Sequence, residues 1–165
     1  MTPELYWVEC PAPGKVAVCA RPRGGLWLDD DLAALKVAGI DTLVCMMVEG
    51  ELRELQLQDE HLLALEAGLS FAWLPVPDLS VPPDDAIIMP MLLALRDELL
   101  AGRTVAAHCR MGVGRSPMCV ASLLVLLGVP AAEAWARITT VRGRDVPDTA
   151  AQGRWVEGLE ILTKA

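Results

Sequence analysis

Short apolar runs recur along the chain and are separated by Gly, Pro and charged residues. Four of these runs have the length and bounds of strands: 16–19, 42–47, 71–74 and 104–107. The run 42–47 is uninterrupted and lies between Asp41 and Glu49, which is typical of a strand buried on both faces. Together they predict the core of a sheet.

Apolar residues at helical spacing fill most of the chain between and after these runs. The expected helices cover residues 29–39, 51–67, 84–101, 115–127, 130–142 and 148–163. The apolar face of the second helix is formed by Leu52, Leu55, Leu62 and Leu65. Pro90 lies inside the third helix and should kink or divide it, because an interior proline costs about 3 kcal/mol.

Strands that alternate with helices predict an α/β fold with a central, mainly parallel sheet of four to five strands flanked by helices. The chain has 165 residues, of which 53% are hydrophobic, so it can bury one sizeable core. No internal repeat, low-complexity tract or linker interrupts the pattern. We therefore expect a single domain over residues 1–165.

The balance of charges narrows the classes of partner. The formal net charge is -8, from 14 basic and 22 acidic residues, so the chain lacks the basic surface that binds nucleic acids and anionic membranes. The longest apolar stretch, 120–129, is interrupted by Ser122 and Gly128 and is too short to span a bilayer. The first residues do not have the pattern of a secretory signal. We expect no nucleic-acid partner and no membrane anchor.

Cysteine usage points to a reducing compartment. The five cysteines are Cys10, Cys19, Cys45, Cys109 and Cys119. Their number is odd and no Cys-x-x-Cys pair occurs, so neither a disulfide scaffold nor a zinc site is expected. The two histidines, His61 and His108, offer few metal ligands. We expect a cytoplasmic protein that uses no metal and no other cofactor.

One cysteine is followed by an arginine at a spacing that carries chemistry. Cys109 begins the pattern Cys-x5-Arg-Ser between the last predicted strand and an apolar helix, and no other cysteine has an arginine six residues further on. Gly112 and Gly114 allow the backbone to curl so that its N–H groups form a nest for an anion. Arg115 supplies a planar fork for two phosphate oxygens. The expected phosphate-binding residues are Arg110, Met111, Gly112, Val113, Gly114 and Arg115.

The same loop is suited to activating the thiol. A free cysteine with a pKa of about 8.5 is only about 3% thiolate at pH 7. Lowering this pKa to about 5.5 requires roughly 4 kcal/mol, whereas one helix dipole supplies at most about 2 kcal/mol. Loop N–H groups and the Ser116 hydroxyl are expected to supply the rest. The alternative is that Cys109 is a small buried residue and that the glycines form an ordinary turn.

The loop resembles the signature His-Cys-x5-Arg-Ser/Thr of the protein-tyrosine phosphatase superfamily, and the chain is similar to its compact dual-specificity branch from about residue 23 to 160. The order of the predicted elements also resembles that family's fold. The resemblance implies a phosphomonoester hydrolase, that is, a protein-tyrosine or dual-specificity phosphatase. It implies that Cys109 forms a phosphocysteine intermediate, that Arg115 grips the phosphate, and that no metal takes part.

A carboxylic acid is needed to protonate the leaving oxygen. Asp78 lies in a proline-rich segment after the third predicted strand, 31 residues before Cys109. That position resembles the general-acid loop of the compact members, although Val76 stands where the larger tyrosine-specific members have tryptophan. On its own, Asp78 would be an ordinary turn residue. Asp84 and Asp85 are rivals that fit better as helix caps.

Three further residues are expected to support the site. The resemblance implies that His108 tunes the environment of Cys109 through buried hydrogen bonds, which is also how a core histidine behaves. Ser116 would donate to the sulfur and help it leave, or would simply be a first-turn serine. Gln152 lies in the segment that begins at Asp148 and would orient water, as a late glutamine does in some compact members. The alternative for Gln152 is a solvated residue on a capped surface helix.

The substrate is less constrained than the chemistry. The expected substrate is a phosphorylated protein or a small phosphomonoester. Arg110 adds a positive charge beside the nucleophile, which leaves open a phosphoinositide or another small-molecule phosphatase; otherwise it is a solvated charge. A further alternative is a phosphate-binding pseudophosphatase, in which the loop binds phosphorylated partners but does not hydrolyse them. A sulfurtransferase does not require the arginine, and an arsenate reductase requires a resolving thiol, for which Cys119 is the candidate although it should face the core.

Overall fold

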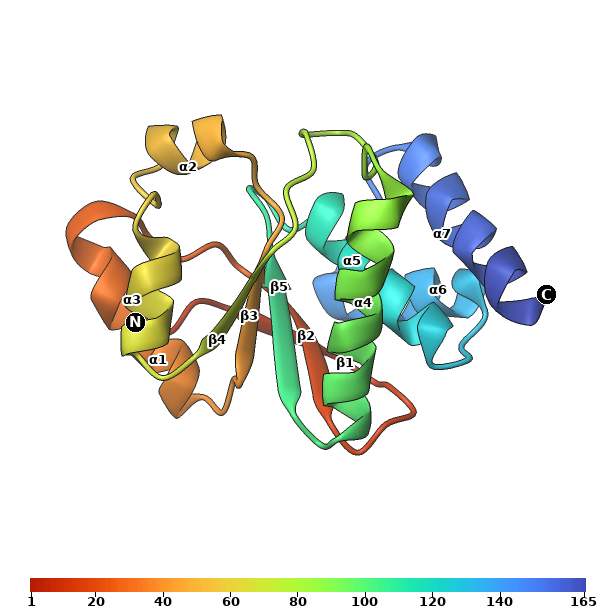
Figure 1. Cartoon of the computed structure of the whole chain (residues 1–165), viewed down its shortest axis with the longest axis horizontal. Helices are drawn as coiled ribbons and strands as arrows, with labels where there is room; N and C mark the ends of the chain where they lie inside the picture. Colours follow the sequence, from red (N-terminus) through yellow and green to blue (C-terminus); the bar gives the residue numbers. More distant parts are fainter.

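A five-stranded sheet forms the middle of the molecule in a computed structural model that describes residues 1–165 (Figure 1). The strands are β1 (Leu5–Val8), β2 (Lys15–Cys19), β3 (Thr42–Cys45), β4 (Ser70–Trp73) and β5 (Thr104–His108). They lie in the order β1-β2-β5-β3-β4, with β1 antiparallel to β2 and every other pair parallel. The expected single-domain α/β fold with a mainly parallel sheet is confirmed.

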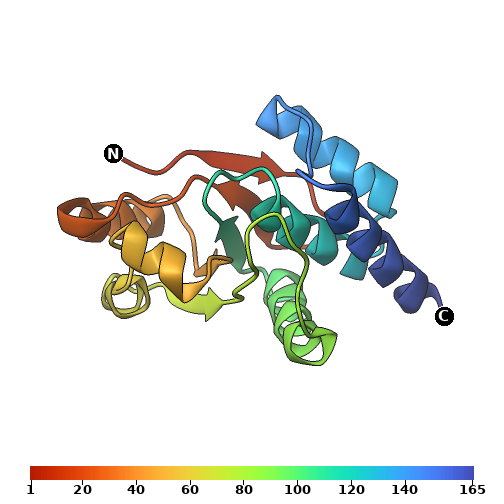
Figure 2. The ribbon, with the colours of Figure 1, turned by 90° about the horizontal axis from the view of Figure 1, so that it is seen from above.

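Helices cover both faces of this sheet. They are the 3-10 helix η1 (Gly25–Trp27) and the α-helices α1 (Leu28–Val37), α2 (Glu49–Glu54), α3 (Glu60–Glu66), α4 (Asp85–Leu100), α5 (Arg115–Leu126), α6 (Ala131–Arg142) and α7 (Ala150–Lys164). Helices α1 and α3 lie on one side of the sheet and α4 to α7 on the other (Figures 1 and 2). The sheet therefore separates two apolar clusters, of which the one on the side of α4 to α7 is the larger.

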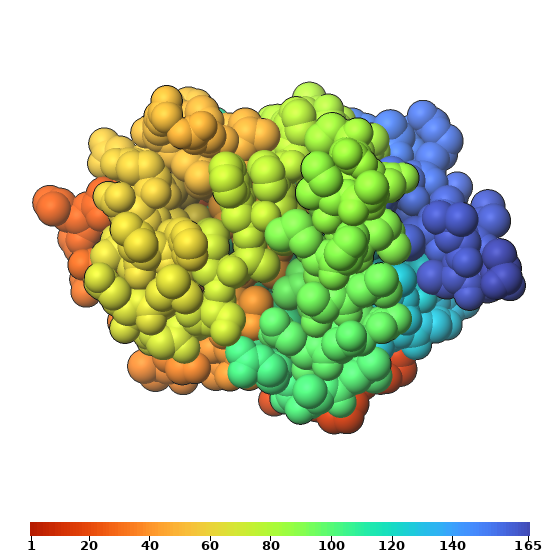
Figure 3. Space-filling model, in the orientation of Figure 1, coloured from red at the N-terminus to blue at the C-terminus, as the bar shows by residue number.

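Helix α5 lies at the centre of the larger cluster. Every residue from Arg115 to Val125 is buried, and the helix packs against α4, α6 and α7. In the space-filling view, α4 covers the middle of the face that is turned toward the reader (Figure 3). A helix that is enclosed on all sides has few positions available to it. Its first residue, Arg115, is therefore held firmly beside the end of β5.

Two expectations about local structure are wrong. The helix expected over 51–67 is two helices, α2 and α3, joined by a turn in which the fully buried residue is Leu57. Leu62 and Leu65, assigned to the apolar face, are 61% and 50% exposed, because the break rotates α3 relative to α2. The division expected as one outcome at Pro90 does not occur, because Pro90 lies near the start of α4 on its exposed side, where the missing N–H removes a single helical bond. The kink expected as the other outcome stays a prediction.

Strand β1 was not among the expected strands. It forms an edge of the sheet through its pairing with β2, from Leu5 opposite Cys19 to Val8 opposite Val16. No helix of the chain is long and apolar enough to cross a membrane.

Candidate active site

Four segments meet at the edge of the sheet where the parallel strands end (Figure 1). They are helix α2, the connection from β4 to α4, the loop from β5 to α5, and the turn from α6 to α7. This edge is where open α/β sheets place their ligands, since several connections converge there. The loop from β5 to α5 contains Cys109, and the connection from β4 to α4 contains Asp78.

The thiol of Cys109 is buried and surrounded by donors. The Gly112 amide donates to its Sγ at 3.3 Å, and the Ser116 hydroxyl lies 3.2 Å from the same atom. Gly112 has a φ of 68°, a left-handed conformation that glycine adopts without strain and that turns its N–H toward the sulfur. Burial raises the pKa of this thiol, but Ser116, the loop amides and Arg115 outweigh burial and lower its pKa below the ordinary value.

Arg115 is fixed by a carboxylate that the sequence analysis did not single out. Its Nη1 and Nη2 donate to the two oxygens of Glu51 at 2.6 and 2.7 Å, and Nη1 also donates to the Val76 carbonyl at 2.9 Å. Burial raises the pKa of Glu51, yet Arg115 and the Val48 amide lower it overall. The Nε–H of Arg115 is buried and has no partner in the protein, so one edge of the fork is left for a ligand.

Asp78 lies next to that open edge. Its Oδ1 is 3.2 Å from Nη2 of Arg115 and accepts a hydrogen bond from the Leu79 amide at 3.0 Å. The side chain is 58% exposed, in contrast to the buried arginine. Its rival Asp84 accepts from the Ala86 amide at 2.9 Å and caps α4, as expected. Asp78 is therefore the acid of this segment that faces the arginine.

A cavity of about 240 Å³ brings these groups together. It is lined by Asp78, Leu79, Cys109, Met111, Val113, Gly114, Arg115, Arg144 and Asp148. Leu79 and Met111 stand at its rim with more than half of each side chain exposed. A larger cavity of about 390 Å³ lies at the turn between β1 and β2 and includes neither Cys109 nor Asp78. The chemistry is concentrated in the smaller one.

Gln152 is fully buried, so its interpretation as a solvated surface residue is wrong. Its Nε2 donates to the Ser80 carbonyl at 3.1 Å, and its Oε1 accepts from the Thr149 amide at 3.2 Å. A Cβ atom added to Gly114 would lie 2.9 Å from the Gln152 amide group. Only glycine at position 114 leaves room for this approach. Gln152 thus links α7 to the connection from β4 to α4, which carries Asp78, and packs against the cysteine loop.

Arg142, at the end of α6, holds the outer side of the cysteine loop. Its Nε donates to the Gly112 carbonyl at 2.8 Å and its Nη2 to the Met111 carbonyl at 3.4 Å. The guanidinium carbon lies 4.1 Å from the centre of the Tyr6 ring. The N–H of the peptide that contains the Met111 carbonyl belongs to Gly112 and donates to Cys109, so Arg142 holds the side of the loop that faces away from the sulfur. Nothing in the sequence distinguished Arg142 from other helix-terminal arginines.

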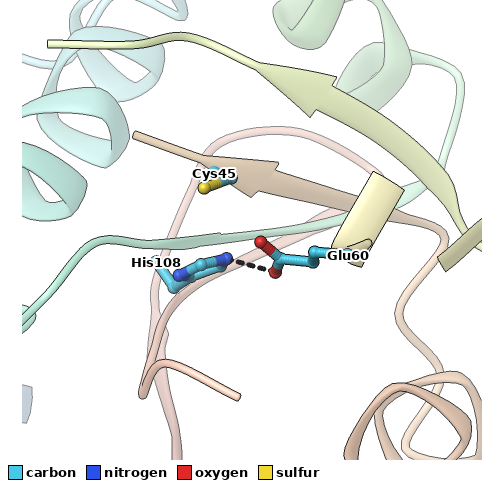
Figure 4. Close-up of side chains that lie close together, drawn as sticks. All are labelled: Cys45, Glu60 and His108. Atoms are coloured by element: carbon cyan, nitrogen blue, oxygen red, sulfur yellow. Dashed lines mark hydrogen bonds and ion pairs between the residues drawn. The ribbon is translucent and has the colours of Figure 1, made fainter. Parts of the chain in front are cut away.

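Beneath the loop, His108 forms a buried pair with Glu60 (Figure 4). Its Nε2 lies 2.6 Å from Oε1 of Glu60, and the two side chains are 0% and 1% exposed. Burial lowers the pKa of His108, but Glu60 and the nearby Cys45 raise it well above the ordinary 6.5. The negative charge of Glu60 thus favours the protonated imidazole, one residue before Cys109.

The same cluster contains three residue types that bind metals. One ligand atom from each of Cys45, Glu60 and His108 lies within 4.8 Å of the others. A tetrahedral zinc with bonds of about 2.0 Å holds its nitrogen and oxygen ligands about 3.3 Å apart. The 2.6 Å between His108 and Glu60 is too short for two ligands of one zinc ion and fits a direct hydrogen bond. The arrangement is that of an ion pair.

Arg110 forms an ion pair with Glu54, so its charge is neutralised. Its Nη1 and Nη2 donate to the two carboxylate oxygens of Glu54 at 3.2 and 2.9 Å. Its side chain is not part of the cavity wall, whereas Arg144 is, and Arg144 makes no ion pair. Arg144 is therefore the uncompensated cation at the mouth of the site, and the sequence analysis overlooked it.

The sheet order and this cysteine loop define the class of cysteine-dependent phosphatases of the protein-tyrosine phosphatase superfamily. Residues 18–129 match the family Tc-R-P, described as "Polymorphic toxin system, DSP-PTPase phosphatase". The chain belongs to this family of dual-specificity-type phosphatases.

Individual relatives agree with this assignment. The chain is 39% identical over 59 residues to mouse laforin, which is 36% of this chain and 18% of laforin. The match thus spans less than a fifth of that relative's length. Kinase-associated phosphatase, with serine substituted for its catalytic cysteine, has a TM-score of 0.88 at 21% identity and covers 100% of this chain and 98% of its own. PTPMT1 in complex with PI(5)P has a TM-score of 0.74 at 19% identity and covers 96% and 97%. These two structures speak for the fold alone.

Proposed function

We propose that this chain, as a single phosphatase domain over residues 1–165, hydrolyses phosphomonoesters through a phosphocysteine on Cys109. The observation that carries the proposal is the position of its sulfur. Sγ lies 3.3 Å from the Gly112 amide and 3.2 Å from the Ser116 hydroxyl, in one cavity with Arg115. A thiol with a lowered pKa, surrounded by donors at a helix N-terminus, is suited to attack a bound dianion.

In the first step, the Cys109 thiolate attacks phosphorus and the bond to the leaving oxygen breaks. The amides of residues 110–115 and the open Nε edge of Arg115 hold the three remaining phosphate oxygens. Asp78 occupies part of that edge through its 3.2 Å contact with Nη2. An incoming phosphate therefore displaces the carboxyl group of Asp78 toward the leaving oxygen, to which it gives a proton.

In the second step, water attacks the phosphocysteine and the sulfur–phosphorus bond breaks. Asp78, now a carboxylate, is available to take a proton from the water, and inorganic phosphate is released. The Ser116 hydroxyl and the Gly112 amide stabilise the departing thiolate. His108 and Gln152 do not contact the phosphate and act indirectly, by holding the residues around the loop through packing and hydrogen bonds.

Turnover of p-nitrophenyl phosphate tests the proposal and separates an enzyme from a pseudophosphatase. We expect Cys109→Ser to abolish turnover, because the hydroxyl does not ionise at neutral pH. The matched control is Cys119→Ser, which changes another buried cysteine in the helix that follows. Full activity in Cys109→Ser, or loss of wild-type activity to a metal chelator, would sink the assignment.

For the substrate, we propose a phosphorylated protein whose phosphorylated side chain enters between Leu79 and Met111. An apolar rim of this kind suits an aromatic or aliphatic group. The alternative, a phosphoinositide or another small phosphomonoester, is favoured by the unpaired Arg144 rather than by Arg110. Rates with phosphotyrosine peptides, phosphoserine peptides and phosphoinositides at equal concentration distinguish these classes.

The proposed chemistry also bears on the cellular location, the partners and the cofactors of the protein. All five cysteines are free thiols, and a nucleophilic thiolate works only while it is reduced, which supports a cytoplasmic location. The net charge of -8 supports a partner other than nucleic acid. No residue of the cavity calls for a metal or another cofactor in the proposed steps.

A further inference from the structure

A second carboxylate lines the cavity that holds Cys109. Asp148 lines the same 240 Å³ space as Cys109, Asp78 and Arg115. It comes from the turn between α6 and α7, whereas Asp78 comes from the connection between β4 and α4. A Cβ atom added to Gly114 would lie 2.8 Å from Oδ2 of Asp148, so this carboxylate lies against the loop residue that precedes Arg115.

The backbone around Asp148 is firmly held. The next residue, Thr149, is the N-cap of α7, and its side chain accepts from the Gln152 amide at 3.2 Å. Gln152 is fully buried and bonded to Ser80 of the acid segment. The backbone that carries Asp148 is thus anchored beside the cysteine loop, and its side chain is exposed at the edge of the cavity.

No cation neutralises this carboxylate. Asp78 lies 3.2 Å from Arg115, but no arginine or lysine forms an ion pair with Asp148, although Arg144 lines the same cavity. An unpaired carboxylate in a site for a phosphate dianion opposes ground-state binding, because like charges repel. A neutral water is not repelled in this way, so the carboxylate is suited to the second step, in which water enters and has to lose a proton.

We propose that Asp148 positions the hydrolytic water in the second step and is the first acceptor of its proton, a role for which Asp78 is also available, while Asp78 alone is the acid of the first step. The inference rests on the proposed function. The water oxygen forms the new bond to phosphorus, the sulfur–phosphorus bond breaks, and its electron pair returns to Cys109 as thiolate. One water proton moves to the Asp148 carboxylate and then to solvent, and phosphate leaves.

Rapid-quench kinetics with p-nitrophenyl phosphate separates the two steps. The release of p-nitrophenol reports formation of phosphocysteine, and acid-trapped phosphoenzyme reports its breakdown. In Asp148→Asn we expect formation at the wild-type rate and breakdown slowed by at least about tenfold, so that phosphocysteine accumulates. KM should fall together with kcat, since both the repulsion and the base are removed. Asp148→Glu should restore part of the breakdown rate.

The matched control is Asp145→Asn, an exposed acid of the same turn that does not line the cavity. It should leave both rates unchanged. Wild-type breakdown in Asp148→Asn would overturn the assignment, and so would equal slowing of both steps, which indicates a structural role. If the wild-type enzyme never forms phosphocysteine, the proposed function itself is wrong. This outcome is distinct from the two that contradict only the role of Asp148.

Discussion

Arg115 and Glu51 form a two-point ion pair, with both Nη groups of the arginine on both oxygens of the carboxylate at 2.6 and 2.7 Å. The arginine is 1% exposed and the glutamate 12%. The guanidinium plane is therefore oriented before phosphate arrives, and its free Nε edge faces the cavity. Pre-orientation of this kind reduces the entropy that binding would otherwise have to lose.

Glu51→Gln tests this relationship with a side chain of nearly equal size. The amide accepts one hydrogen bond from Arg115 in place of two charged ones, so the guanidinium is free to turn. We expect kcat/KM for p-nitrophenyl phosphate to fall by about 10- to 100-fold, in line with the loss of a buried charged hydrogen bond of about 1.5–3 kcal/mol. Glu49→Gln on the same helix, which removes an exposed pair with Arg53, should have almost no effect.

Asp78→Asn should slow the reaction in proportion to the demands of the leaving group. General acid catalysis contributes about 10²- to 10⁴-fold for a poor leaving group and much less for one that departs readily. A series of aryl phosphates therefore checks the role, because the wild-type to variant ratio should rise with the basicity of the leaving phenol. The control is Asp84→Asn, which keeps a helix-capping residue. A ratio that is constant across the series would contradict the acid role.

The geometry of the cysteine loop was predictable because it depends on residues that are close together in the sequence. Cys109, Gly112 and Arg115 lie within one turn between a strand and a helix, so their spacing carries the geometry. Asp78 could be singled out only through the family resemblance; it lies 3.2 Å from Arg115, and its role as the acid stays a prediction.

The supporting residues were not predictable for the opposite reason. Glu51 lies 64 positions from Arg115, Glu60 lies 48 from His108, and Arg142 lies 30 from Gly112. Each looks like an ordinary helical charge, since only the sheet order brings it to the loop. The division of α2 from α3 was missed for a related reason: Leu62 and Leu65 continue the helical spacing of Leu52 and Leu55, although the chain turns between them.

Ser116→Ala should raise the pKa of the nucleophile. Burial alone would raise the pKa of Cys109, and the Ser116 hydroxyl is the foremost group that offsets it. Loss of a charged hydrogen bond of about 1.5–3 kcal/mol corresponds to a rise of about one to two pH units. Since the thiolate is the reactive form, the midpoint of alkylation by iodoacetamide, followed at Cys109 by mass spectrometry, should move upward with it.

The control for that measurement is Ser122→Ala, in the same helix, which removes a hydroxyl bonded to the Met118 carbonyl at 2.7 Å. It should leave the alkylation midpoint of Cys109 unchanged. An unchanged midpoint in Ser116→Ala as well would mean that the loop amides and Arg115 suffice to hold the thiolate.

Glu60→Gln should change how stability depends on pH. Burial lowers the pKa of His108 in the folded protein, but the charge of Glu60 outweighs burial and raises the pKa overall. Protonated His108 therefore stabilises the fold, and this stabilisation is complete at pH values below the pKa of histidine in the unfolded chain, near 6.5. It is lost as the pH rises through the higher pKa of the folded state. The wild-type free energy of unfolding should therefore decline above neutral pH by more than that of the variant.

Urea unfolding at a series of pH values measures this difference. Breaking a buried pair costs about 3–5 kcal/mol, so Glu60→Gln should be clearly less stable at pH 6, and the gap should narrow toward pH 9. Glu66→Gln changes an exposed acid on the same helix and should follow the wild type. A gap that is constant over this range would show that His108 does not change its protonation, and that Glu60 acts by packing alone.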